Sequence, residues 1–186
     1  NTIGRDATMP DNLVNSLFID RTGVLWIGTE NKGLCCLDLY AKKFRSIIQE
    51  AGGLSDNLVT ALTGGQSVLY AGTASSGIDI FRIEGKRFYK LGNIPRVVIG
   101  AGRWKKEVSA LCLDSDSNLW IGTATNRLVV LNRNGSSDSY VVNGFVFSLL
   151  EDKEGRIWFG TWGQGFGYID KRTRNIVQYY DTPITV

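Results

Sequence analysis

The hexapeptide Val24-Leu25-Trp26-Ile27-Gly28-Thr29 decides the fold, because it recurs three more times along the 186 residues. The other copies are residues 68–73, 118–123 and 156–161. The aromatic positions 26, 70, 120 and 158 are separated by 44, 50 and 38 residues. A repeat of ~40–50 residues that holds several strands is typical of propeller blades.

The residues around each copy repeat as well. An Asp stands six residues before the aromatic in three copies, and a tight turn such as 152–155 follows it. The carboxylate of such a turn accepts nearby backbone N–H bonds, and the closing glycine tolerates positive φ. We therefore assign the aromatics to packing between blades and the aspartates to turn capping. The structural residues of the repeat are Trp26, Tyr70, Trp120, Trp158, Gly28, Gly72, Gly122, Gly160, Asp20, Asp114 and Asp152.

Each repeat reads as four strands joined by turns, and no segment shows helical periodicity. The predicted fold class is all-β, a β-propeller of four consecutive four-stranded antiparallel blades. A sandwich is the alternative, but four copies of one unit with two apolar faces favour a radial array. The predicted blades are residues 11–50, 56–92, 107–143 and 144–182 of one propeller segment, with 1–10 as a linker or the tail of a preceding blade.

Composition argues against several classes of function. The chain has no histidine, which removes His-based triads and most catalytic zinc sites. Its formal net charge is only +3 and no long run of like charges occurs, so we expect no nucleic-acid contact. No apolar run is long enough for a membrane span. We expect no cofactor, no metal and no enzyme activity within this segment, which has no initiating Met and reads as a piece of a longer protein.

The three cysteines are interpreted as packing residues. Cys36 and Cys112 align with apolar positions of the other repeats, and Cys35 is adjacent to Cys36 in a strand, so their side chains face opposite ways.

Two tryptophans lie outside the repeat and are the strongest candidates for ligand contact. Trp104 belongs to the long connection before the third blade, and Trp162 to a loop of the fourth. An exposed indole offers a flat apolar face to the C–H side of a sugar ring. The alternative is packing of each loop onto its own blade. Polar residues predicted on the same face are Arg127, Arg103, Asn126, Gln164, Lys32 and Glu30. Their arginines favour an anionic sugar, and ordinary solvated charge is the alternative.

The motif Asp-x-x-Gly-x-Leu-Trp-Ile-Gly-Thr-x-x-x-x-Gly-Leu, which residues 20–34 match closely, resembles the two-component regulator propeller repeat. The resemblance covers nearly the whole chain. It implies the periplasmic sensor region of a hybrid two-component protein of Bacteroides-type bacteria, anchored in the inner membrane and followed by a histidine kinase and a response regulator. It also implies oligosaccharide ligands and larger rings, often of seven blades. The second repeat departs from the motif with Tyr70 and without the Asp, and the third with Ser117 and Arg127.

Three functions follow as hypotheses. The leading one is a sensor segment that binds a glycan-derived oligosaccharide without covalent chemistry and relays the signal to a histidine kinase. The second is a scaffold for protein–protein interaction without a small ligand. The third, against which the missing histidines weigh, is an enzyme such as a propeller lyase or a quinone-dependent dehydrogenase. Expected partners are other blades of the same protein and a second copy, which would associate through open blade faces.

Overall fold

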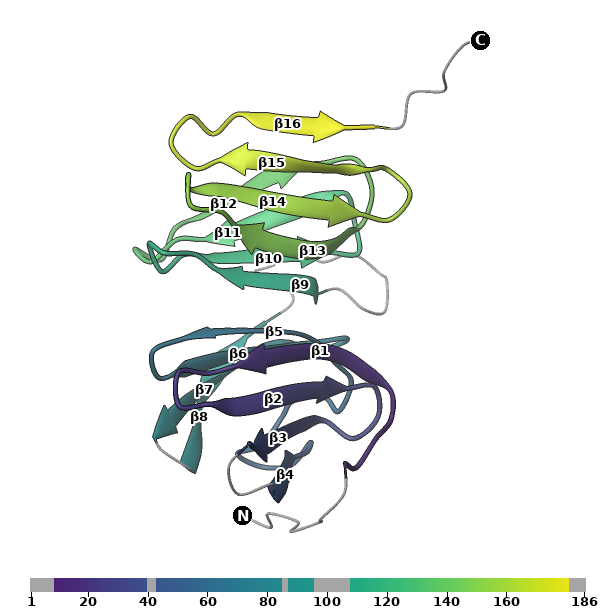
Figure 1. Cartoon of the computed structure of the whole chain (residues 1–186), viewed down its shortest axis with the longest axis vertical. Helices are drawn as coiled ribbons and strands as arrows, with labels where there is room; N and C mark the ends of the chain where they lie inside the picture. Colours follow the sequence, from purple (N-terminus) through teal and green to yellow (C-terminus); the bar gives the residue numbers. More distant parts are fainter. Residues whose placement is uncertain (1–8, 40–42, 85–86, 96–107, 181–186) are drawn as a thin grey trace. The chain divides into compact units, whose positions relative to one another are not determined.

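A computed structural model describes residues 9–39, 43–84, 87–95 and 108–180, and these form four separate four-stranded antiparallel sheets (Figure 1). Within each sheet the strands are hydrogen-bonded in sequence order. The predicted fold class, an all-β propeller of four consecutive blades, is confirmed. The chain divides into two compact units, residues 1–108 and 109–186, each of which is described by itself.

The first unit contains blades one and two. Blade one consists of β1 (Val14–Ile19), β2 (Val24–Thr29), β3 (Leu34–Asp38) and β4 (Lys43–Ile47). Blade two consists of β5 (Val59–Gly65), β6 (Val68–Thr73), β7 (Gly77–Glu84) and β8 (Arg87–Ile94).

Blades three and four make up the second unit. Blade three consists of β9 (Val108–Leu113), β10 (Leu119–Thr123), β11 (Arg127–Leu131) and β12 (Ser137–Val141), and the boundary between the units falls at its first residue. Blade four consists of β13 (Val146–Glu151), β14 (Arg156–Thr161), β15 (Phe166–Asp170) and β16 (Ile176–Tyr179).

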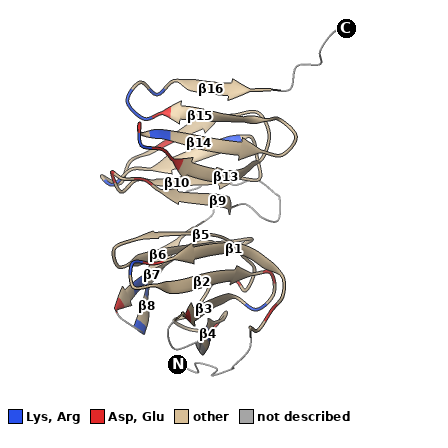
Figure 2. Cartoon of the chain, viewed as in Figure 1, with Lys and Arg blue, Asp and Glu red and all other residues tan. Residues whose placement is uncertain are grey.

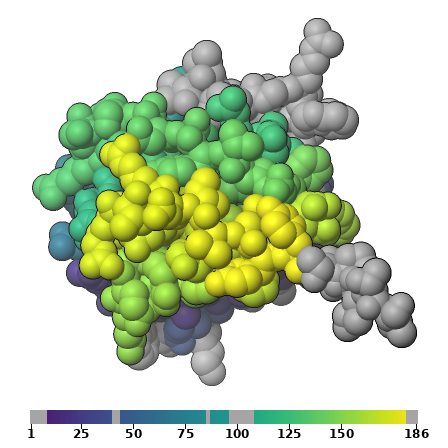
Figure 3. Space-filling model, turned by 90° about the horizontal axis from the view of Figure 1, so that it is seen from above, coloured from purple at the N-terminus to yellow at the C-terminus, as the bar shows by residue number. Residues whose placement is uncertain are grey.

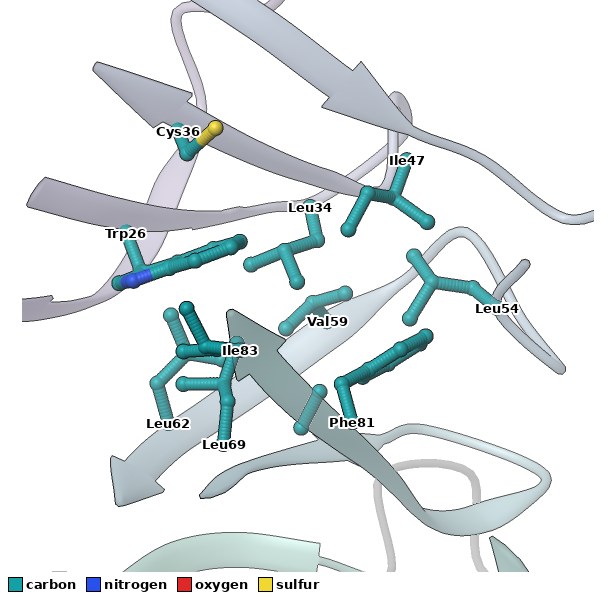
Figure 4. Packing of buried hydrophobic residues seen from close by; sticks show 11 residues of the cluster. Trp26, Leu34, Cys36, Ile47, Leu54, Val59, Leu62, Leu69, Phe81 and Ile83 are labelled. Carbon is teal, nitrogen blue, oxygen red and sulfur yellow. The ribbon is translucent and has the colours of Figure 1, made fainter. Parts of the chain in front are cut away.

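In each unit the core lies between two facing blades. In the first unit Trp26 and Leu34 of blade one pack against Val59, Leu69 and Phe81 of blade two (Figure 4). In the second unit the core between blades three and four is built from Trp120, Leu128, Val146, Ile157, Phe159 and Ile169. The predicted packing role of the repeat tryptophan therefore holds for Trp26 and Trp120, which are almost fully buried.

In blades one and three, the glycine two residues after the tryptophan leaves room for the following blade. A Cβ on Gly28 would lie 2.7 Å from the Val59 side chain, and one on Gly122 would lie 2.7 Å from the Val146 side chain. Both distances are shorter than a carbon–carbon contact allows, so each valine occupies the space that the missing side chain provides. The Trp-x-Gly pattern thus indicates where the next blade packs closely against the strand.

The repeat aspartates close the turns as predicted and also bind the repeat tryptophans. The indole nitrogens of Trp26, Trp120 and Trp158 donate to the aspartates six residues earlier at 2.8, 2.9 and 2.6 Å. Burial alone would raise the pKa of Asp114, but hydrogen bonds from Trp120 and Asn118 outweigh it and hold that pKa below its ordinary value. The pKa values of Asp20 and Asp152 are lowered for the same reason.

The outward face of blade four differs from its counterparts because no described residue covers it. Trp158 stacks with Tyr168 at 4.9 Å between ring centroids, and the Arg156 guanidinium lies 5.3 Å from each of the two rings. Phe166 and Tyr179 continue this aromatic face and are 52% and 47% exposed. β16 (yellow) lies at the surface when the molecule is seen from above (Figure 3).

We predict that Gly122→Ala destabilises the protein by about 1–3 kcal/mol, because the added methyl overlaps Val146 of the facing blade. Gly160→Ala is the matched control, since only the Ser148 side chain lies near the corresponding position in blade four. Chemical denaturation measures both variants. Equal destabilisation by the two substitutions would contradict the packing role assigned to Gly122.

Acid should weaken the fold through the repeat aspartates. Their folded pKa values lie below the unfolded value of ~3.9, so their contribution is complete above about pH 4 and is lost as the pH falls through the folded values. Asp114→Asn should cost about 1–3 kcal/mol at neutral pH and reduce the loss of stability below pH ~4. Melting temperatures measured from pH 7 downward test this, and parallel profiles for the two proteins would disprove it.

Candidate functional site

Each blade has two different ends. The turn edge carries the Asp turns, whereas the loop edge carries the loop between the second and third strands and the connection to the next blade. The loop is closed by the Thr of the Gly-Thr pair, whose hydroxyl donates to a carbonyl four residues later in all four blades. These bonds join Thr29 to Gly33, Thr73 to Gly77, Thr123 to Arg127 and Thr161 to Gly165 at 2.7–2.9 Å.

In the second unit, two loop-edge segments lie against each other. The backbone N–H of Trp162, in the loop of blade four, donates to the Phe145 carbonyl of the connection from blade three at 2.9 Å. The Val142 N–H donates to the Asn126 carbonyl at 3.0 Å and joins the same connection to the loop of blade three. The loops of both blades and the segment between them therefore form one continuous edge.

Gln178 of β16 holds the loop edge of blade four through hydrogen bonds of its side-chain amide. Its side-chain NH₂ donates to the carbonyls of Asn143 and Gln164 at 2.9 and 3.0 Å, and its oxygen accepts from the Asn143 N–H at 3.1 Å. The Asn143 side chain in turn donates to the Tyr180 hydroxyl. One amide thus holds both segments, which makes the loop edge of blade four an ordered surface.

Trp162 projects from this surface and is 71% exposed. Its indole lies on the ring of Phe147, with centroids 5.4 Å apart, and Phe147 is itself 55% exposed. We name the group formed by Phe145, Phe147, Trp162 and Gln164 the aromatic edge. Such a surface can bind the apolar face of a ring-shaped ligand while the neighbouring amides supply hydrogen bonds.

The other predicted site residues are distributed over both units. Asn126 and Arg127 lie on the loop edge of blade three, where both are exposed and the Arg127 guanidinium donates to Ser139 at 3.2 Å. Glu30 and Lys32 lie on the loop edge of blade one, where Glu30 accepts from the Asn15 amide at 2.9 Å. Among the described residues, Trp162 and Gln164 share the loop of blade four, and Asn126 is joined to the same edge through the Val142 N–H. Glu30 and Lys32 belong to the other unit. Trp104 and Arg103 lie outside the described residues.

Sequence reasoning missed Phe145, Phe147, Asn143 and Gln178. A signal for Phe147 was available, because the residue after the first Val of each blade is Asn15, Thr60, Ser109 or Phe147, and only blade four is apolar there. No comparable sequence signal marks Gln178, whose role depends on the pairing of Gly167 with Gln178 across β15 and β16.

The turn edge of the second unit is rich in charge but is already internally paired. Lys171 binds Glu151 at 2.5 Å and Asp116 at 2.7 Å, and so joins the turn of blade three to blade four. A polar depression of about 450 Å³ nearby is lined by Asn118, Asn132, Arg133, Asn134, Ser136, Asp138 and Arg174. Its asparagines mostly bond to the turns themselves, as when Asn118 accepts from the Arg133 N–H at 3.0 Å.

The described residues hold no cluster of three or more His, Cys, Asp or Glu side chains suited to a metal ion. Cys36 is buried in the first core and Cys112 is partly buried in the second, and burial raises the pKa of Cys112 to about 11. No helix that could span a membrane occurs in the part of the chain that the structure describes.

Comparison with known families identifies the repeat. Residues 8–31, 104–125 and 140–163 match the family model described as two component regulator propeller. These segments are two-component regulator propeller repeats. They fall on the first halves of blades one, three and four, whereas blade two, which lacks the Asp and carries Tyr70, is not matched. No curated protein matches the sequence.

Solved structures share the fold of these propeller repeats. An extracellular domain assigned to a one component system of B. thetaiotaomicron is 22% identical with a TM-score of 0.70, and the match covers 91% of this chain and 24% of that one. One assigned to a hybrid two component system of the same organism is 18% identical with a TM-score of 0.56, covering 94% and 30%. Virginiamycin B lyase from Staphylococcus aureus is 16% identical with a TM-score of 0.55, covering 98% and 75%. Since sensors and a lyase share this fold, the fold alone does not decide function.

We predict that Gln178→Ala loosens the aromatic edge, because three hydrogen bonds to the two loop-edge segments are lost. Hydrogen exchange of the Asn143 amide should accelerate about tenfold, as expected for the loss of a contact of ~1.4 kcal/mol. Gln164→Ala is the control, since Gln178 binds only the main chain of Gln164. Unchanged exchange in Gln178→Ala would show that the loops are ordered by other contacts.

Proposed function

We propose that this chain is part of the periplasmic ligand-sensing region of a hybrid two-component sensor and that it binds a glycan-derived oligosaccharide at the aromatic edge. The observation that carries the proposal is the exposed Trp162 indole, held on Phe147 beside loops that Gln178 keeps in place. The two-component regulator propeller repeats support a sensor rather than an enzyme. The chain spans only 24% and 30% of the two extracellular domains it matches, so other parts of such a sensor would contribute to signalling.

Binding of this kind requires no covalent step. The indole covers the C–H face of a pyranose, and the amides of Asn143 and Gln164 exchange hydrogen bonds with its hydroxyl groups. The ordered edge limits the conformational entropy lost on binding. Relay to a histidine kinase then requires that the ligand binds one arrangement of the sensor better than another, since only differential affinity shifts such an equilibrium.

A scaffold for protein association is the second candidate, and the open face of blade four favours it. Leu150, Phe166 and Tyr179 are 65%, 52% and 47% exposed on that face. Further blades or a second copy of the chain would bury this apolar area and gain stability in proportion. The two candidates are compatible, because the open face and the aromatic edge are different surfaces of blade four.

Binding of oligosaccharides to the intact chain, measured by calorimetry, tests the proposed function. Trp162→Ala should weaken binding about tenfold, because loss of an aromatic contact of ~1.4 kcal/mol changes affinity by that factor. Leu91→Ala is the control, since Leu91 is 55% exposed on β8 in the other unit. If a broad panel of oligosaccharides fails to bind the folded protein, the sensor proposal fails and the scaffold function is favoured.

A further inference from the structure

Phe147 is an aromatic residue at a repeat position where the other blades carry a polar side chain. In β1 and β13 the register with the next strand shifts directly after the first valine, and the bulged residues are Asn15 and Phe147. Such bulges turn a side chain away from its regular direction in the sheet. The residue at this point therefore faces the rim of the blade instead of its core.

In the other blades this residue bonds to the following blade. The Asn15 amide donates to the Val59 carbonyl at 3.0 Å, and the Ser109 hydroxyl donates to the Val146 carbonyl at 2.5 Å. A phenyl ring cannot donate such a bond. Blade four has no following blade among the described residues, so Phe147 has no such carbonyl to bond, and its ring instead lies exposed beside Trp162.

Blade four differs from the other blades at a second position, which is in contact with Phe147. Trp162 follows the Gly-Thr pair, where the other blades carry Glu30, Ala74 and Ala124. The two substituted residues contact each other, with ring planes inclined at 41°. Phe147 thus supports one side of the indole and leaves the other free, as its 71% exposure requires.

The two described segments that carry this pair are uncharged. Residues 142–148 and 161–168 contain no Lys, Arg, Asp or Glu, and the connection between β14 and β15 is accordingly tan throughout (Figure 2). The polar groups there are amides, such as those of Asn143 and Gln164, together with the Tyr180 hydroxyl. A carboxylate or sulfate brought onto the indole would lose water without gaining an ionic partner.

We propose that Phe147 determines the ligand class of the aromatic edge, which accepts neutral pyranose residues and disfavours uronic or sulfated ones. This inference rests on the proposed function and makes it specific. It differs from the anionic ligand that Arg103 and Arg127 favour in the sequence, which stays a prediction. The Arg127 guanidinium bonds to Ser139 on the outer strand of blade three, whereas Phe147 directly carries the indole.

The experiment compares the intact chain and three variants against neutral oligosaccharides and uronic-acid or sulfated oligosaccharides of equal length. Phe147→Ser installs the residue that blade three uses at this point, so the fold should be retained. Phe147→Tyr keeps the aromatic support, and Arg127→Gln removes the arginine predicted for the ligand face in the same unit. Circular dichroism and melting temperature verify folding of each protein.

We expect the intact chain to prefer neutral ligands by about tenfold or more. Phe147→Ser should lose about tenfold in affinity for them, whereas Phe147→Tyr and Arg127→Gln should retain it within about threefold. A preference for acidic ligands, or an unchanged affinity in folded Phe147→Ser, overturns this inference and leaves the sensor function standing. Absence of binding to either ligand class overturns both.

Discussion

The close approach of a valine to a glycine is the contact on which each unit depends. Side-chain atoms of Val59 and Val146 lie 2.7 Å from where a Cβ of Gly28 or Gly122 would be, and the Trp two residues earlier packs in the same core. At these positions the missing side chain lets the valine fit between the two sheets, so that their apolar faces interdigitate. The tryptophan and the glycine are two residues apart and therefore lie on the same face of the strand. One short motif thus provides both the gap that the valine enters and the aromatic side chain beside it.

The Asp–Trp hydrogen bond adds a second constraint to the same strand. The carboxylate caps the turn and accepts from the indole nitrogen, so a large aromatic can be buried without an unsatisfied N–H. In blades one, three and four the turn edge is therefore already used for turn capping and for binding the indole N–H. In the second unit this extends to Lys171, which bonds to the turn of one blade from a strand end of the other.

Much of the fold could be predicted from the sequence, because the repeat expresses local rules. Glycine spacing, Asp turns and alternating strands each depend on residues a few positions apart, and four copies confirm one another. The candidate site was predicted only in part. Trp162 is visible as a departure from the repeat, but its support by Phe147 depends on a bulge, and its ordered loops depend on Gln178 from a strand paired two steps away. Such relations exist only once the strands are paired.

The turn edge and the loop edge of a blade therefore tolerate amino-acid substitution to different degrees. A substitution on the turn edge removes a carboxylate that both capping and tryptophan burial require, so function at that end conflicts with folding. On the loop edge the threonine-to-carbonyl bond closes the loop through one side chain and leaves the three residues between free to differ: 30–32, 74–76, 124–126 and 162–164. Phe147 is the informative case, because no following blade is described to which it could bond, and its ring instead contacts an exposed indole. An aromatic pair that is exposed on an ordered loop edge is the kind of surface that binds another molecule.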